Sequence, residues 1–186
     1  MTVAGIDLRE YPGLVPGLVV TVLLALILRR RLGEVLEVHP IVAAAIVFAS
    51  GLVISVTLTP GAEAIDPWRP PVEATTIGCD VDRVTPLPPA AFATITEASL
   101  NVYLLVPLGL ILAIVPRSRW RVGCIAAAFA LPPLIETVQL VVPALGRACQ
   151  SADVVDNWTG LILGLAIATV AHVIRGSRFA RRWEQI

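Results

Sequence analysis

The chain has 186 residues, of which 56% are hydrophobic and 15% are charged, and its formal net charge is zero. Its mean hydropathy of +0.82 is too high for a water-soluble domain, in which polar and apolar positions alternate along each element. The sequence has no charged tail and no basic patch with interleaved aromatic residues, which excludes nucleic acid as a partner. We therefore expect a single integral membrane domain over residues 1–186.

Five apolar stretches predict five transmembrane helices, because about 20 apolar residues cross the hydrocarbon core of a bilayer. The first and third stretches are short, and each needs flanking residues to reach that length. The predicted fold class is therefore all-α, with five membrane-spanning helices. The stretches are Leu14–Leu28, Ile41–Leu58, Leu100–Val115, Val122–Val142 and Trp158–Ile174.

The longest connection, about Thr59–Ala98, is rich in proline. Its seven prolines exclude a long regular helix or a central strand. A loop of this length is usually functional or flexible. We expect the third helix to begin near Pro89, since proline is well tolerated in a first helical turn.

The basic residues are all arginine, and most of them fall on one side of the predicted spans. Cytoplasmic loops of membrane proteins carry the excess of basic residues, so the arginine-rich side is expected to be cytoplasmic. The protein is then a multi-pass plasma membrane protein with its N-terminus and proline-rich loop outside and its C-terminus inside. The arginine-rich side carries Arg29, Arg30, Arg31, Arg117, Arg119, Arg121, Arg175, Arg178, Arg181 and Arg182, and the other side carries Arg9, Arg69, Arg83 and Arg147.

Two of the three cysteines fall on the predicted outer side. Cys79 lies in the long loop, and Cys149 lies in the loop between the fourth and fifth spans. An oxidising exterior permits a bridge between them, and we favour a Cys79–Cys149 disulfide that holds the long loop over the second connection. The alternative is two unrelated free thiols. Cys124, at the cytoplasmic start of the fourth span, is expected only to pack.

The fourth span contains a carboxylate and an amide on one helical face, Glu136 and Gln139. A carboxylate inside the membrane is costly and indicates a functional or paired role. Pro132 and Pro133, one turn earlier, remove two amide donors and so predict a kink or local opening.

Further polar residues belong to the same outer half. Asn101 lies near the outer end of the third span, and Arg147 lies in the short outer loop. We expect Asn157 to open the fifth helix, with Asp153 and Asp156 just before it, where acidic side chains suit the unpaired amides of a helix N-terminus. The predicted ligand-binding set is therefore Asn101, Glu136, Gln139, Arg147, Asp153, Asp156 and Asn157.

Each of these residues also has a purely structural interpretation. Glu136 would pair with Arg147, and an aspartate would act only as a helix cap. Asn101 would join two helices through a hydrogen bond. Gly160 and Gly164 have a G-x-x-x-G spacing that lets another helix approach closely, either within the chain or in a homo-oligomer.

Three segments in order resemble signatures of the VanZ-like membrane protein family. Residues 101–109, NVYLLVPLG, resemble its N-x-x-x-F-x-P-x-G, and residues 135–139, IETVQ, resemble its I-E-x-x-Q. The run from Arg147 through Asp153, Asp156 and Asn157 to Gly164 resembles its R-x-x-D-x-x-D-x-x-x-N-x-x-G-x-x-x-G. The resemblance is strongest over residues 97–171. It departs in two places: Leu105 or Val106 stands where an aromatic is common, and the acids before Asn157 are more closely spaced, which leaves open whether Asp153 or Asp156 is the family's acid.

The resemblance implies a protein of the bacterial cell envelope, in a family named for an association with teicoplanin resistance. It also implies that Glu136, Gln139, Arg147, Asp153 and Asn157 form a shared polar site, without fixing a reaction. Our first hypothesis is that an outward-facing pocket binds the headgroup of a membrane lipid, a lipid-linked cell-wall intermediate or a glycopeptide, with Arg147 holding a phosphate or carboxylate.

Two other function classes stay open. The first is an outer-leaflet enzyme that acts on a membrane lipid, with Glu136 as general acid or base or with the carboxylates holding Mg²⁺ or Ca²⁺. The second is a transporter subunit with Glu136 on an ion path. His39 and His172 lie near the predicted cytoplasmic ends of their helices, which argues against a histidine-dependent phosphatase or a zinc site. We expect no cofactor and no resident metal.

Overall fold

The computed structural model describes residues 13–60, 78–81, 83–116 and 118–183, and two short strands before residue 13, with side chains as far as Ile174. Residues 61–77 of the proline-rich loop lie outside the described residues, as do Arg9, Arg69 and Arg117. The side chains of the four arginines after Ile174 are likewise not described.

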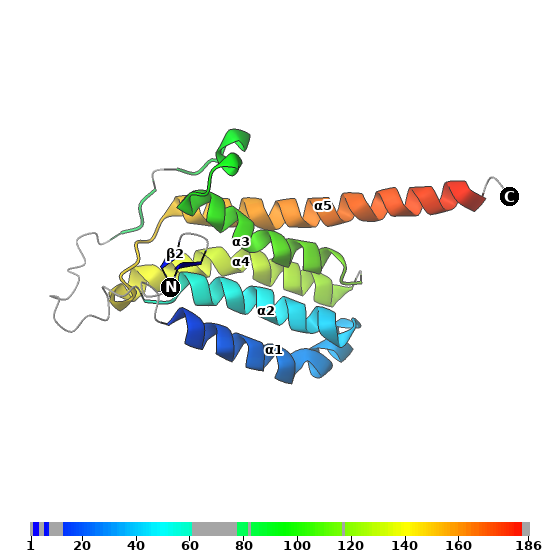
Figure 1. The fold of residues 1–186 in the computed structure, drawn as a ribbon, viewed down its shortest axis with the longest axis horizontal. Helices are drawn as coiled ribbons and strands as arrows, with labels where there is room; N and C mark the ends of the chain where they lie inside the picture. Colours follow the sequence, from blue (N-terminus) through cyan, green and yellow to red (C-terminus); the bar gives the residue numbers. More distant parts are fainter. Residues whose placement is uncertain are drawn as a thin grey trace.

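The described residues form a bundle of five α-helices whose directions alternate, so that loops alternate between its two ends (Figure 1). The predicted all-α class is confirmed in this part of the chain, and the two strands are only a two-residue antiparallel pair in which Thr2 faces Asp7. The elements are β1 (Thr2–Val3), β2 (Ile6–Asp7), α1 (Leu14–Leu36), α2 (Pro40–Thr57), the 3₁₀ helix η3 (Pro89–Ala93), α3 (Glu97–Ala113), α4 (Arg119–Val141), the 3₁₀ helix η4 (Pro143–Leu145) and α5 (Ser151–Trp183).

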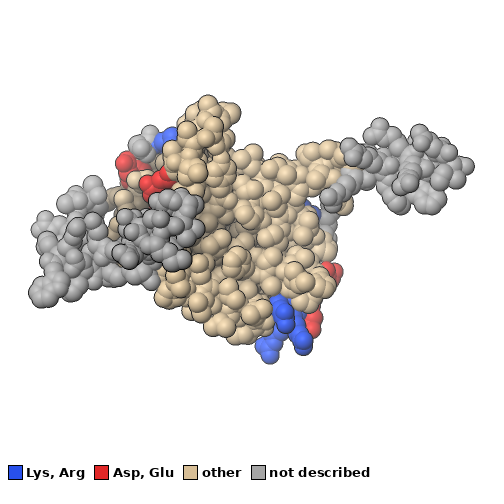
Figure 2. Space-filling model, viewed as in Figure 1, with Lys and Arg blue, Asp and Glu red and all other residues tan. Residues whose placement is uncertain are grey.

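Three of these helices are long and apolar enough to cross a membrane: α2, α4 and the part of α5 from Ser151 to Ile174. Helix α3 is apolar but has only 17 residues, and α1 carries Arg29–Arg31 within its last turns. The length and composition of these helices indicate a membrane protein. That all five helices cross the membrane stays a prediction. In the face shown in Figure 2, charged side chains gather at the two ends of the bundle with an uncharged surface between them.

Helices α1 and α2 form a hairpin whose contact is made by small residues. A Cβ on Gly17 would lie 2.9 Å from Ser55 Oγ, and one on Gly51 would lie 2.5 Å from Thr21 Cγ2. The buried hydroxyls of Thr21 and Ser55 lie 3.3 Å apart and form a hydrogen bond between the two helices. Close backbone approach and a shared polar contact are the usual means of helix association in lipid.

Helix α3 packs against α5 at still closer range. A Cβ on Gly160 would lie 1.9 Å from the Val102 carbonyl oxygen, and one on Gly164 would lie 2.2 Å from that of Val106. The predicted close approach at the G-x-x-x-G spacing is confirmed, and the partner is α3 of the same chain. A homo-oligomer, which stays a prediction, would need a different contact surface.

The apolar core lies between the last four helices. Its buried members come from α2, α3, α4 and α5, so one continuous core joins these four helices. They are Ala49, Val53, Leu105, Leu108, Leu112, Ala128, Ile135 and Leu161.

The expected start of the third helix near Pro89 is wrong. Pro89–Ala93 forms the separate 3₁₀ helix η3, and α3 begins at Glu97. A capping box determines this start, because the Thr96 hydroxyl accepts from the Ser99 amide at 3.2 Å and the Ser99 hydroxyl accepts from the Thr96 amide at 2.9 Å. Two otherwise unpaired amides are satisfied there, so the helix begins after Thr96.

The two prolines of α4 leave carbonyl groups without their usual donors. Pro133 has no amide to offer the carbonyl of Phe129, one turn earlier. The indole of Trp158 on α5 donates to this carbonyl at 2.8 Å. A side chain of the neighbouring helix thus replaces the missing hydrogen bond, which is how membrane helices tolerate an internal proline.

Helix α5 begins earlier than its sequence predicts. It starts at Ser151, so Asp153 is in its first turn and Asp156 and Asn157 lie within the helix. The expectation that Asn157 opens the helix is therefore wrong. Asp153 still suits the positive end of the helix, whereas Asp156 is stabilised by a partner from another segment, described below.

Candidate functional site

The disulfide predicted between Cys79 and Cys149 is present, with a Cα–Cα distance of 4.7 Å. Around it, the Asp80 amide donates to the Cys149 carbonyl and the Ser151 amide donates to the Asp80 carbonyl, each at 2.9 Å. Residues 78–81 and 83–85, which we call the strap, therefore lie along the connection between α4 and α5. The described part of the proline-rich loop is fixed to the start of α5 by covalent and backbone bonds.

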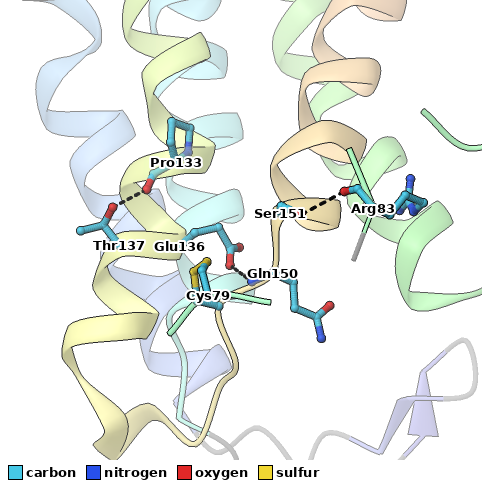
Figure 3. The surroundings of a disulfide bond; sticks show 8 residues. Cys79, Arg83, Pro133, Glu136, Thr137, Gln150 and Ser151 are labelled. Carbon is cyan, nitrogen blue, oxygen red and sulfur yellow. Dashed lines mark hydrogen bonds between the residues drawn. A yellow bond between two sulfur atoms is a disulfide. The ribbon is translucent and has the colours of Figure 1, made fainter. Parts of the chain in front are cut away.

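Glu136 lies directly beside this disulfide (Figure 3). One of its carboxylate oxygens and the sulfur atoms of Cys79 and Cys149 all lie within 4.8 Å of one another. The side chain is only 5% exposed, and its carboxylate accepts a hydrogen bond from the Gln150 amide at 2.8 Å. The carboxylate is thus held against the residue that follows Cys149.

The alternative ion pair between Glu136 and Arg147 is not formed. Arg147 instead donates to the carbonyl of Val56 at 3.3 Å. Gln139 donates to the carbonyl of Thr57 at 3.1 Å. Both side chains thereby join the α4 end of the site to the last turn of α2, whose terminal carbonyls have no amide partner within their own helix.

Asp156 is completely buried, and its charge is balanced by an arginine of the strap. Arg83 donates from Nη1 to one carboxylate oxygen at 3.0 Å and from Nη2 to the other at 2.5 Å. Arg83 also donates to the Thr85 carbonyl, and its own carbonyl accepts from the Ser151 hydroxyl at 3.0 Å. This two-bond geometry is the strongest form of arginine–carboxylate contact.

Sequence reasoning missed Arg83 as part of the site. Two signals pointed to it: it is one of four arginines on the side poor in arginine, and it follows Cys79 closely enough to be fixed by the same disulfide. Neither signal identified which aspartate it would meet, because that depends on how the strap lies across α5.

Asn101 and Asp153 connect α3 to α5 at the surface of the site. The Asn101 amide donates to a carboxylate oxygen of Asp153 at 2.7 Å, and both side chains are half-buried. Asn157, one turn further along α5, is buried and donates to the Asp153 backbone carbonyl at 2.8 Å.

The seven predicted site residues therefore gather at one end of the bundle, but they differ in what they can contact. Glu136, Gln139, Asp156 and Asn157 are buried. Asn101, Arg147 and Asp153 are half-buried, so part of each side chain lies at the surface.

Two buried acceptor atoms have no hydrogen-bond partner among the described residues, Oε1 of Gln139 and Oδ1 of Asn157. Each belongs to a side chain whose amide nitrogen is already used.

Comparison with known proteins gives a match to a family model. No curated protein and no solved structure matches the chain. The model of the VanZ/LLP1 family matches residues 41–172, which covers α2, α3, α4 and most of α5, together with every residue of the candidate site. The chain therefore belongs to the VanZ/LLP1 family of membrane proteins.

Proposed function

We propose that this protein binds the headgroup of a lipid-linked cell-wall intermediate or a glycopeptide-type ligand at the outer surface of the bacterial plasma membrane. The observation that carries the proposal is the half-buried pair of Asn101 and Asp153, which stands on a buried polar network at the end of an apolar bundle. A ligand held there would keep its lipid chain beside the apolar helices and its headgroup in the polar cluster.

The chemistry of the exposed groups supports a sugar-bearing headgroup. Asp153 accepts hydrogen bonds from hydroxyl or amine groups, and the side-chain oxygen of Asn101 adds a directional acceptor. Arg147 is half-buried and carries the positive charge that would meet a phosphate or carboxylate. Membership of a family associated with teicoplanin resistance supports a resistance-type role.

Two independent signals support an extracytoplasmic location of the site. The arginine-rich end of the bundle is the opposite one, and a disulfide is stable in oxidising compartments. The N-terminus would then be outside and the C-terminus in the cytoplasm. Green fluorescent protein fused to the C-terminus should fluoresce and alkaline phosphatase fused there should be inactive; the reverse pattern would overturn this orientation.

Binding is tested with purified protein in nanodiscs and a polyprenyl-diphosphate-linked amino sugar as the probe. Asp153→Asn and Arg147→Ala should each weaken binding at least about tenfold, the loss expected when one charge-assisted hydrogen bond is removed. Gly123→Ala is the matched control, since it lies in α4 with nothing within 4 Å of its added Cβ.

Two further probes distinguish recognition of the sugar from recognition of the diphosphate or of any anionic lipid. Polyprenyl diphosphate without the sugar should bind weakly, and phosphatidylglycerol should not compete. Equal binding of all three probes, or unchanged binding by a well-folded Asp153→Asn variant, would overturn the proposal. Turnover of the probe that is lost in Glu136→Gln would replace binding with an outer-leaflet enzyme activity.

A further inference from the structure

The two cysteines of the disulfide differ in their exposure to solvent. Cys79 is exposed, whereas Cys149 is only 6% exposed. In thiol–disulfide exchange an incoming thiolate attacks one sulfur and the other sulfur leaves as a thiolate. The difference in exposure makes Cys79 Sγ the atom that is attacked and Cys149 Sγ the leaving atom.

A buried thiolate is costly, so a leaving group at Cys149 needs a proton. Glu136 is the group placed to provide it, since its carboxyl oxygen lies within 4.8 Å of both sulfur atoms. A hydrogen bond from the Gln150 amide fixes this carboxyl group beside the residue next to Cys149. An exposed sulfur, a buried sulfur and a buried carboxyl group thus lie together.

The strap would stay in place after the disulfide opens. Two sets of contacts hold it without the sulfur atoms: Asp80 pairs with the backbone of Cys149 and Ser151, and Arg83 bonds to Asp156. Cys79 is therefore held near Cys149 in the reduced protein, so the bond can open and close without unfolding of the bundle.

We propose that Cys79 and Cys149 form a thiol–disulfide exchange centre for dithiol substrates, with Glu136 as the proton donor to Cys149. The substrate thiolate attacks Cys79 Sγ, the bond between the two sulfurs breaks, and Cys149 Sγ takes the proton of the Glu136 carboxyl group. The second substrate thiol then attacks the mixed disulfide and releases Cys79, which receives that thiol's proton. The dithiol loses two electrons to the protein disulfide, and Glu136 regains its proton from water.

The experiment uses full-length protein in a Cys124→Ser background, so that the thiols counted come only from Cys79 and Cys149. Dithiothreitol at a fixed pH is the probe, and thiols are counted over time with a maleimide-linked polymer. Glu136→Gln should slow reduction at least about tenfold, since positioned acids typically contribute about 100-fold or more. Glu97→Gln, an exposed acid at the same end of the bundle, is the matched control and should reduce at the original rate.

Single-cysteine variants test the assigned direction of attack. Cys149→Ser leaves Cys79, which should form a mixed disulfide with 5,5′-dithiobis(2-nitrobenzoate) at least about tenfold faster than Cys149 does in Cys79→Ser, because thiol reactivity follows access and thiolate character. Equal rates for the two variants would overturn the assignment. Reduction that requires denaturant, or a folded Glu136→Gln that reduces at the original rate, would identify the bond as purely structural.

Discussion

The contact between α3 and α5 gives the sharpest prediction, because one added methyl group should force the two helices apart. In Gly160→Ala, the new Cβ would lie 1.9 Å from the carbonyl oxygen of Val102 and 2.8 Å from its carbonyl carbon. Ordinary contact begins near 3.4 Å, so the atoms must separate by about 1.5 Å. The obstacle is backbone and has no rotamer that relieves it.

The expected loss follows from two opposing terms. Overpacking of a close contact costs about 3 kcal/mol or more when the backbone must shift. Replacement of a helical glycine by alanine returns about 1 kcal/mol through lower chain entropy and higher helix propensity. The net loss in the free energy of unfolding is therefore about 2 kcal/mol, and more if the neighbouring contact of Gly164 with Val106 also opens.

Gly123→Ala is the matched control, because it has the same chemical change in α4 with open space around the new atom. It should gain up to about 1 kcal/mol, so the two variants should differ by about 3 kcal/mol. Thermal unfolding in detergent, followed by tryptophan fluorescence, should give Tm values that differ by roughly 6–12 °C. Equal Tm values for the two variants would refute the close helix contact.

Three further variants test single contacts by the same measurement. Trp158→Phe keeps an aromatic side chain but removes the indole donor to the Phe129 carbonyl, and should cost about 1–3 kcal/mol. An unchanged Tm would mean that another donor satisfies this carbonyl. Arg83→Ala should cost roughly 3 kcal/mol because it leaves the buried Asp156 carboxylate unpaired, and much of that loss should return in the double variant with Asp156→Ala. Thr96→Ala should cost about 1 kcal/mol through loss of the helix cap, and a loss of zero would contradict the capping box as the cause of the α3 start.

The helices were predictable from the sequence because a membrane-spanning helix is identified by its own apolar residues, without knowledge of the helices that pack against it. Every expected stretch overlaps a helix of the structure. The disulfide was predictable for a related reason: the spans fix the side of each cysteine, and only Cys79 and Cys149 share a side away from the arginines. The helices and the disulfide could thus be inferred from the composition of each segment and from the alternation of loops between the two sides of the membrane.

The internal contacts of the site were not predictable, because they depend on how separate segments lie across one another. Asp156 has the pattern of a residue before a helix, and its burial within α5 depends on the charge of Arg83 in the strap. The structural alternative for Glu136 was an ion pair with Arg147, whereas its carboxylate accepts from the backbone amide of Gln150, which no side-chain pattern reveals. The capping box at Thr96 could have been recognised, since a threonine three residues before a serine is a local signal.

The hydrogen bond from Trp158 to Phe129 has a consequence for biogenesis. Until α5 enters the bilayer, the carbonyl of Phe129 faces hydrocarbon with its usual donor missing, so α4 on its own is an incomplete membrane segment. Insertion of the last two helices as a pair avoids that state. A chain truncated before α5 should consequently be released poorly into lipid and be degraded, although every residue of α4 is present.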